Sequence, residues 1–329
     1  MTDDTPRPMR PALIRIAAAS AFALVFAWGV YALLQAARPE GGTIGFAFLL
    51  VLPAAISAFV AYVADPWKTR THRAYLTIPL WLLGAVVLLS LVVLREGVIC
   101  VVLLAPLWLV SGMLGAEVAY RVRRRVRDAR TYSVAMLALP LIAIQVEPYV
   151  PLPVATVTVT RSVVVRATPA RLWPMLQGIP DVRPGEGGWN LTQDVLGVPR
   201  PIGARLVGTG VGADRHARWQ HGVRFRERVM QWQPQRRLGW RFIFDDMTGW
   251  GYTDRHLLPD STYFRVASGG YTADPLAPGL TSVTLHTTYR VRTPVNAYAA
   301  LWGEMFLGDL ENKLLTVIRD RAERRDSVD

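Results

Sequence analysis

The sequence RVRRRVRDAR, Arg121–Arg130, holds six arginines and one aspartate, and it divides the chain into two unlike parts. Long apolar blocks precede it, whereas most of the sequence after Pro151 has the mixed composition of a soluble domain. Basic residues beside a bilayer stay on the cytoplasmic side, where each gains about 1 kcal/mol at the anionic leaflet. We therefore interpret the run as a topology determinant. A solvated helix end and a nucleic-acid patch are the alternatives.

The composition indicates a membrane half and a soluble half. The 329 residues are 51% hydrophobic, and the apolar residues concentrate in the first 150 positions. The net charge of +12 is shared by both halves without a dense basic stripe in the second, so we expect no nucleic-acid partner. Cys100 is the only cysteine, which excludes an intrachain disulfide and a cysteine-based metal site. The five histidines lack metal-site spacing, and we expect no metal and no cofactor.

Five apolar blocks in residues 1–150 predict an all-α transmembrane bundle. Each has about 20 residues, which as a helix crosses ~30 Å of hydrocarbon. The first block is longer than the apolar core of a signal peptide, so we expect it to be retained. The predicted spans are residues 16–37, 43–64, 74–94, 97–120 and 131–149.

The loop charges predict the orientation of this bundle in a bacterial inner membrane. With the amino terminus inside, only Arg38 and Arg95 among the lysines and arginines of this half lie outside. The fifth block is ambiguous, because its uninterrupted apolar core, Val134–Ile144, is short and Glu147 follows it closely. We expect it to span, which makes residues 151–329 periplasmic. If it lies at the interface, they are cytoplasmic.

After a proline-rich linker, the pattern predicts a strand, a short helix, several strands and a long terminal helix. Threonine and valine alternate in the strand Ala155–Ala167, and Thr168 as N-cap begins a helix at Pro169–Gln177. The other predicted strands are Ala204–Gly212, Ala217–Gln233, Arg236–Asp245, Thr262–Thr272 and Leu280–Arg292, with a turn at Asp274–Gly279. The helix Val295–Arg324 carries an apolar stripe of Tyr298, Trp302, Phe306, Leu310, Leu314 and Val317.

Three segments of this half carry a resemblance to a known superfamily. They are VTVTRSVVVRATPARLWPML (residues 157–176), the pattern F-x-E-x-V-x-x-W-x-P-x-x-x-L-x-W-x-F from Phe225 to Phe242, and SGGY with LTSVTLHTTYRVRTPVNAYAALWGEMFLGDLENKLLTVI (residues 268–318). They resemble the SRPBCC superfamily of START-like, polyketide cyclase/dehydrase-like proteins. The resemblance implies an α+β helix-grip domain, a curved antiparallel sheet around a long carboxy-terminal helix that encloses a hydrophobic cavity. It does not fix a function, because the superfamily includes lipid carriers, receptors, cyclases and co-chaperones.

Period-two alternation places one carboxylate, Glu227, on a cavity-facing row. A buried acid needs a partner or a raised pKa, and such positions are enriched in functional sites. A structural ion pair is the alternative. We expect aromatic side chains to line the cavity with Glu227, although such rows are also typical of a core. These candidate ligand-binding residues are Phe225, Trp240, Phe242, Tyr263, Tyr289, Trp302 and Phe306. The loop Asp246–Asp254, with Trp250 and Tyr252, is a candidate cavity mouth.

These features favour a membrane-anchored domain that binds a hydrophobic small molecule. The ligand would be a lipid, an isoprenoid or a polyketide-like compound, held for presentation or transfer beside the lipid bilayer. No recognisable catalytic set is present in the sequence. The alternatives are a cyclase or isomerase that uses Glu227 as acid or base, and a protein-binding assembly or stress factor.

The predicted topology is tested by alkaline phosphatase fusions, since that enzyme needs disulfides and is active only outside the cytoplasm. A fusion after Asp329 should be active in intact cells. A fusion after Lys68, in a predicted cytoplasmic loop, is the inactive control. An expressed but inactive Asp329 fusion would place the second half in the cytoplasm.

Overall fold

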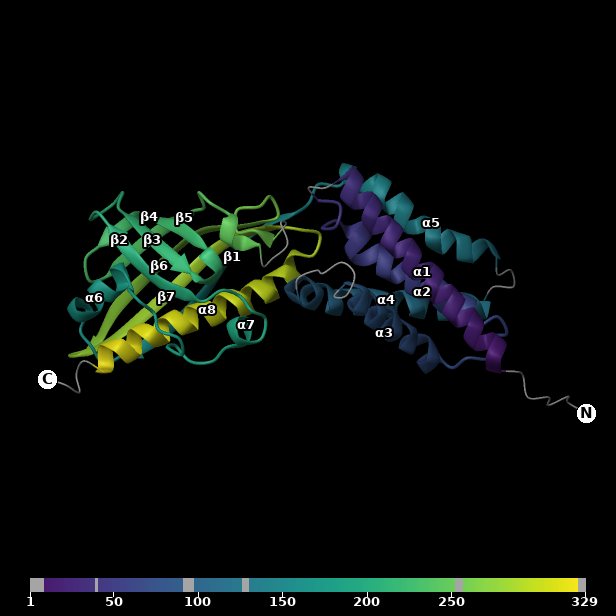
Figure 1. Cartoon of the computed structure of the whole chain (residues 1–329), viewed down its shortest axis with the longest axis horizontal. Helices are drawn as coiled ribbons and strands as arrows, with labels where there is room; N and C mark the ends of the chain where they lie inside the picture. Colours follow the sequence, from purple (N-terminus) through teal and green to yellow (C-terminus); the bar gives the residue numbers. More distant parts are fainter. Residues whose placement is uncertain (1–8, 39–40, 91–97, 126–129, 252–256, 325–329) are drawn as a thin grey trace, which may run out of the picture. The chain divides into compact units, whose positions relative to one another are not determined.

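The computed structural model describes residues 9–38, 41–90, 98–125, 130–251 and 257–324. The chain divides into two compact units, Met1–Leu152 and Pro153–Asp329, and each is described by itself (Figure 1).

The amino-terminal unit is helical. It contains α1 (Met9–Ala37), a π-helical turn η1 (Ala47–Val51) that continues into α2 (Leu52–Ala64), α3 (His72–Leu89), α4 (Val98–Arg125), α5 (Arg130–Val146) and the turn η3 (Glu147–Tyr149). Among the described residues, five helices are long and apolar enough to cross a membrane. The end of the third predicted span and the beginning of the fourth, residues 91–97, lie outside the described residues.

Helix α2 is the central helix of this unit. Its side chains are mostly buried, and α4 approaches so closely at Gly115 that a β-carbon there would overlap the Ala54 carbonyl oxygen. The surrounding helices instead expose large apolar side chains. Examples are Trp28 on α1, Trp81 on α3, Leu114 on α4 and Ile142 on α5. A helical unit that is apolar on its outer surface has the pattern of a membrane bundle.

Part of the arginine run belongs to the packing of the bundle. The fourth span was predicted to end at residue 120, but α4 continues to Arg125. Arg123 is buried and donates to the carbonyl oxygens of Asp65 (2.9 Å) and Pro66 (2.8 Å), at the end of α2. These bonds satisfy backbone acceptors that a helix end leaves free. Residues 126–129 of the run lie outside the described residues.

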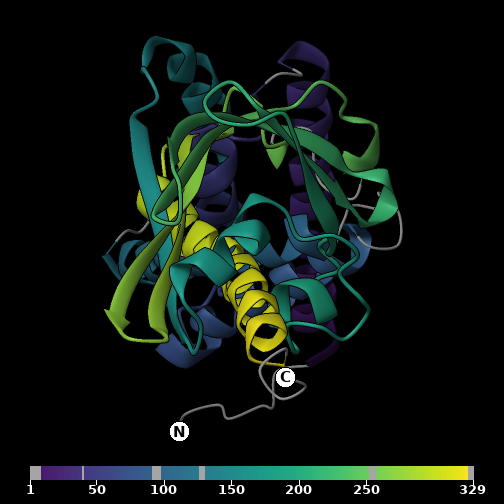
Figure 2. The same cartoon turned by 90° about the vertical axis from the view of Figure 1, so that its left-hand side faces the viewer.

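The carboxy-terminal unit is a single seven-stranded antiparallel sheet around one long helix. The strand order is β1-β7-β6-β5-β4-β3-β2, and helix α8 (Asn296–Arg324) packs chiefly on β1 and β7. Figure 2 looks toward the end of α8 and shows the strands arching around it. The strands are β1 (Val154–Val165), β2 (Pro201–Val207), β3 (Asp214–Trp219), β4 (Arg224–Gln233), β5 (Arg237–Ile243), β6 (Phe264–Ala277) and β7 (Leu280–Arg292). The predicted helix-grip fold, preceded by a helical region, is confirmed.

Three predicted strand boundaries are wrong. The strand predicted over Ala204–Gly212 is β2, Pro201–Val207, and Gly208, Gly210 and Gly212 after it have positive φ values. The segment Ala217–Gln233 is two strands, because His221 and Gly222 have φ values of 58° and 80° and reverse the chain between β3 and β4. The predicted turn Asp274–Gly279 is largely strand. Gly279, with φ of 75°, allows a tight hairpin turn, so Asp274 still pairs with Ser282 of β7.

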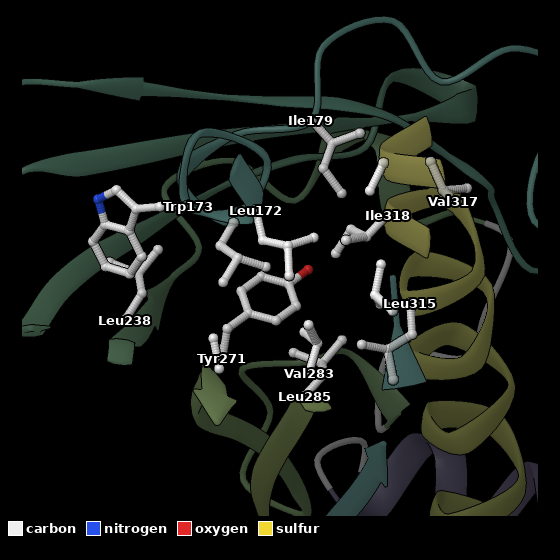
Figure 3. Packing of buried hydrophobic residues seen from close by; sticks show 14 of the residues in the cluster. Leu172, Trp173, Ile179, Leu238, Tyr271, Val283, Leu285, Leu315, Val317 and Ile318 are labelled. Atoms are coloured by element: carbon white, nitrogen blue, oxygen red, sulfur yellow. The ribbon is translucent and has the colours of Figure 1, made fainter. Parts of the chain in front are cut away.

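Two short helices, α6 (Pro169–Gln177) and α7 (Leu191–Asp194), complete the unit. The carboxy-terminal half of α8 packs with α6 on the sheet in the larger buried cluster, and a smaller buried cluster around Tyr289 includes Ala299 and Leu307 of the amino-terminal half of α8. Figure 3 shows α6 and the end of α8 meeting the sheet around Tyr271, whose hydroxyl points toward α8. The labelled core residues are Leu172, Trp173, Ile179, Leu238, Tyr271, Val283, Leu285, Leu315, Val317 and Ile318.

Helix α8 has two apolar faces, where the sequence predicted one stripe. Of the predicted stripe, Val317 is buried, whereas Tyr298, Trp302, Phe306, Leu310 and Leu314 are half-buried. The fully buried positions lie on the adjacent face, at the same helical spacing. They are Glu311, Leu315, Ile318 and Ala322.

The contact of α8 with β7 predicts an unusual response at Gly303. Alanine is normally the better helix former by about 1 kcal/mol. A β-carbon on Gly303, however, would overlap the hydroxyl of the fully buried Tyr289. We expect Gly303→Ala to lower the unfolding free energy by about 1–3 kcal/mol, measured by thermal unfolding of the full chain in detergent. Gly251→Ala is the control, since nothing lies within 4 Å of its β-carbon position. An unchanged or higher Tm for Gly303→Ala would contradict this packing.

Candidate functional site

Five aromatic rings form an aromatic cluster; they come from β3, β4, β5, the residue that follows β5 (Phe244) and the turn η5 (Thr248–Trp250). Phe242 stacks on Phe244 at 6.1 Å, and each lies within 5.8 Å of Phe225 on β4. Trp250, predicted to lie at a cavity mouth, packs edge-on against Phe244 at 5.8 Å, while Tyr252 lies outside the described residues. The fifth ring is Trp219, 5.7 Å from Phe225. Apart from Phe225, these rings are only half-buried.

A second set of rings lies on α8. Tyr298, Trp302 and Phe306 follow one another at four-residue steps, and their centroids are 6.2 and 5.8 Å apart. All three are half-buried, in contrast to the fully buried residues in the carboxy-terminal half of the helix. The structure therefore brings two of the predicted site residues, Trp302 and Phe306, together on one helix face, and Phe225 and Phe242 together on the sheet.

Glu227 forms a buried ion pair with Arg215. The two residues face each other across β3 and β4, and both side chains are less than one-tenth exposed. Arg215 also donates Nε to the Gln177 carbonyl oxygen (3.1 Å), and its guanidinium lies 5.1 Å from the Trp240 ring. Burial raises the pKa of Glu227 and Arg215 opposes that rise. Loss of the Glu227 charge would leave Arg215 buried without its counter-ion, which costs about 3–5 kcal/mol in measured cases.

A bulge in β6 decides which residue faces inward at the beginning of the strand. An unbroken alternation through β6 would put Tyr263 on the same face as Tyr271. The register shifts between Val266 and Ser268, so Phe264 faces inward instead and packs on Tyr289 at 5.3 Å. Tyr263 lies one residue before β6. A bulge of this kind leaves no period-two signal in the sequence.

Several buried polar atoms in this unit have no hydrogen-bond partner among the described residues. Leaving such a group unsatisfied costs about 1–3 kcal/mol, and native folds usually supply water or a ligand. The atoms are Trp240 Nε1 and Trp302 Nε1, and also the Tyr271 hydroxyl and the Glu311 carboxylate oxygens, whose polar neighbours, Arg215 and Thr287, lower the pKa values of the two groups without a close hydrogen bond. All belong to side chains of β5, β6 and α8, between which the predicted cavity was expected.

Glu311 is the most unusual of these residues. It is 2% exposed on the face of α8 that meets β7. Burial raises its pKa to about 8, although Thr287 of β7 and Arg161 of β1 favour the ionised form. Glu311 is not among the residues predicted for the site from the sequence. Glu311 lies four residues after Leu307 and four before Leu315. An acid at a position of an apolar helical repeat is therefore the sequence signal that could have identified it as a buried acid.

A cleft in this unit is polar and is therefore less suited to a hydrophobic ligand. A cleft of about 600 Å³ beside the end of α8 is lined mostly by charged side chains, including Arg166, Arg319 and Glu323. The described residues contain no group of three or more histidine, cysteine, aspartate or glutamate side chains that could hold a metal ion.

No protein-family model matches the chain, and no curated protein matches it. Solved structures are similar to about half of the chain. Norcoclaurine synthase of Thalictrum flavum is 13% identical, with a TM-score of 0.33 over 53% of this chain and 99% of that chain. The Zhui aromatase/cyclase of Streptomyces sp. R1128 is 15% identical, with a TM-score of 0.34 over 52% and 96%. A START superfamily protein of Mycobacterium smegmatis is 12% identical, with a TM-score of 0.34 over 51% and 98%. At these values, the similarities assign no activity or ligand to this chain.

The environment of Glu311 predicts a pH-dependent stability. Its pKa is about 8 when folded and near 4.5 when unfolded, so the folded state binds the proton more tightly. The stability it contributes is complete below pH 4.5 and is lost as the pH rises to about 8. Glu311→Gln cannot ionise and should be the more stable protein at pH 8, by on the order of a few kcal/mol, but not at pH 4.5. The measurement is the Tm of the full chain in detergent across this range. Asp320→Asn, at a partly exposed position of the same helix, is the control. Parallel stability curves for wild type and Glu311→Gln would show that Glu311 is not a buried acid.

Proposed function

We propose that the chain is a membrane-anchored START-like protein whose carboxy-terminal unit binds a hydrophobic small molecule between its sheet and α8. The ligand is a lipid, an isoprenoid or a polyketide-like molecule, and the protein presents or transfers it next to the bilayer. The observation that carries this proposal is the contrast along α8. Its carboxy-terminal half is packed as core, whereas the rings of its amino-terminal half and of the aromatic cluster are only half-buried.

The geometry of the sheet supports an interior that protein side chains fill incompletely. Neighbouring strands are about 4.8 Å apart, so seven strands are on the order of 30 Å wide. A helix with its side chains is only about 10–12 Å across. Helix α8 covers β1 and β7, and α6 covers part of the core, but the half-buried aromatic cluster lies on β3, β4 and β5. An apolar ligand resting on these rings would gain about 25 cal/mol for each Å² that it removes from water.

Membrane anchoring is supported by the surface of the amino-terminal unit. Large apolar side chains are exposed on α1, α3, α4 and α5, including Val134 and Ile142 of the fifth predicted span. In water such a surface would drive association, whereas lipid chains would cover it without cost. The exposed apolar side chains of α5 support the spanning arrangement, and we propose with it the periplasmic location of the second unit.

The ion pair of Glu227 favours binding over acid–base catalysis. A catalytic carboxyl group must exchange its proton during each turnover. Glu227 is instead the buried counter-ion of Arg215, so its protonation would leave an unpaired buried charge.

The proposal is tested by mass spectrometry of the molecules that remain with the full chain after purification in detergent. We expect one class of hydrophobic molecule at about one copy per protein in the wild type. The variant Trp302→Ala/Phe306→Ala removes the ring face of α8 and should lose most of it. Trp189→Ala is the matched control, because Trp189 is 72% exposed and annular lipids would be unaffected by either change. Equal retention in all three proteins would contradict binding inside the domain.

The same measurement separates a carrier from an enzyme that uses Glu227. In a carrier, Glu227→Gln and wild type hold the same molecule. In an enzyme, the variant would accumulate the substrate where the wild type holds the product.

A further inference from the structure

The rings of the aromatic cluster lie together at one end of the sheet. Because neighbouring strands are antiparallel, the first residues of β1, β4 and β6 lie at the same end as the last residues of β3, β5 and β7. Trp219 ends β3, Phe225 is the second residue of β4, and Phe242 is near the end of β5. The larger buried cluster, which includes Leu238 and Val283, lies toward the opposite end of the same strands.

Helix α8 brings its own rings to the same end. Asn296, the first residue of α8, donates from Nδ2 to the carbonyl oxygen of Pro153 (2.9 Å), immediately before β1 begins. Tyr298 and Trp302 follow in the first two turns of the helix, and Leu301 between them is 70% exposed. The aromatic cluster and these two turns of α8 together are named the ring-bearing end of the unit.

The chain enters the carboxy-terminal unit at the ring-bearing end. The turn η3 ends at Tyr149, and β1 begins at Val154. Five residues of extended chain span at most about 18 Å, so the beginning of β1 stays within that reach of Tyr149. Tyr149 is 86% exposed and Val154 is 62% exposed. Exposed apolar side chains therefore flank the connection on both sides.

The connection leaves the helical unit at the end of its bundle that lies opposite the arginine run. Arg38, which follows α1, donates from Nη1 to the carbonyl oxygen of Ile144 in α5 (2.8 Å). Glu147, which follows α5, accepts a hydrogen bond from the amide of Ala47 at the beginning of η1 (3.2 Å). Arg123, near the end of α4, instead contacts the other end of α2. Helix α5 follows α4 in the chain, so it runs from the arginine-run end of the bundle to the opposite end. In a membrane it would reach the surface just before β1 begins.

The ring-bearing end also carries exposed arginines. Arg218 and Arg224 are directly opposite each other on β3 and β4, and both residues are exposed. Like charges at such positions destabilise a sheet. Of the nearby acids, Asp246 is influenced by Arg224, whereas Asp245 is paired with Arg226. Lipid phosphates would offset the repulsion between the opposed arginines, so this end is complementary to an anionic membrane surface.

We propose that the ring-bearing end is a membrane-docking surface, which rests on the headgroups of the bilayer that anchors the chain. Tryptophan and tyrosine are favoured at a membrane–water interface, because each has an apolar ring and a polar N–H or O–H group. Leu301 and Trp302 insert among the headgroups, while Arg218 and Arg224 bind lipid phosphates. The inference rests on the proposed function, because docking here lets a hydrophobic ligand pass between the rings and the leaflet without crossing water.

The test places a fluorescent probe at either end of the sheet in the full chain. The chain is reconstituted in nanodiscs of equal parts phosphatidylcholine and phosphatidylglycerol. In a Cys100→Ala background, Leu301→Cys or Leu276→Cys provides one thiol for a nitrobenzoxadiazole probe. Leu276 is 57% exposed near the end of β6, so it is the matched control at the far end of the sheet. Quenching by lipids with a spin-labelled headgroup then reports contact between the probe and the bilayer.

We expect strong quenching at position 301 and little at position 276. The variant Arg218→Glu/Arg224→Glu should remove about half or more of the quenching at position 301, because repulsion replaces attraction to the anionic lipid. Arg236→Glu/Arg237→Glu is the matched control, since it reverses two exposed arginines at the hairpin between β4 and β5, at the far end of the sheet. This control should leave the quenching unchanged. The Tm of each variant in detergent verifies that it is folded.

The outcomes separate docking from the alternatives. Quenching that is stronger at position 301 and falls in Arg218→Glu/Arg224→Glu supports the docking surface. Equal quenching at the two positions, or none at either, overturns it. A blue-shifted but unquenched probe at position 301 also overturns it, because the surface is then covered by protein instead of lipid.

Mass spectrometry of the co-purified molecules in the same wild-type samples distinguishes this inference from the proposed function. If the bound hydrophobic molecule is present but the probe at position 301 is not quenched, docking is overturned and ligand binding stands. If no such molecule is present, the proposed function is contradicted whatever the probe reports.

Discussion

The carboxy-terminal unit depends on one constraint, which is that a single helix must cover the inner face of a seven-stranded sheet. Helix α8 meets this constraint on β1 and β7, where Leu315, Ile318 and Ala322 are fully buried. It is too narrow to reach the far strands as well. On those strands, Phe225 is buried, whereas the other rings of the aromatic cluster are half-buried, and the proposed ligand would complete their burial.

Two buried glutamates of this unit differ in their neighbouring side chains and therefore in how readily they ionise. Glu227 faces Arg215 on the adjacent strand and is held as a counter-ion. Glu311 lies beside Thr287, and burial raises its pKa to about 8, although Thr287 and Arg161 favour the ionised form. The first glutamate is therefore tied to the charge of Arg215, whereas burial shifts the second toward its protonated form.

A soluble helical bundle buries its apolar side chains and exposes polar ones. The amino-terminal unit differs, since apolar side chains lie on its outer surface as well as in its interior. Its polar residues concentrate at helix ends. Arg123 binds the carbonyl oxygens that end α2, and Asp65 accepts hydrogen bonds from the Tyr75 hydroxyl and the Thr69 amide. Such contacts supply hydrogen bonds to backbone and side-chain groups, which lipid chains cannot provide. Part of the arginine run is thus built into the bundle, in addition to its predicted effect on topology.

The sequence by itself determined the properties that depend on local pattern. Apolar block length predicted five membrane-length helices, and strand and helix periodicity predicted the order of elements in the helix-grip fold. It also placed Phe225, Phe242, Trp302 and Phe306 on the faces where the structure shows ring clusters. Only the tertiary structure decided the partner of Glu227, the inward turn of Phe264 and the burial of Glu311. Each of these depends on residues far apart in the chain, through strand register, a bulge or helix–sheet contact, and such long-range pairings leave no periodic signal in a single sequence.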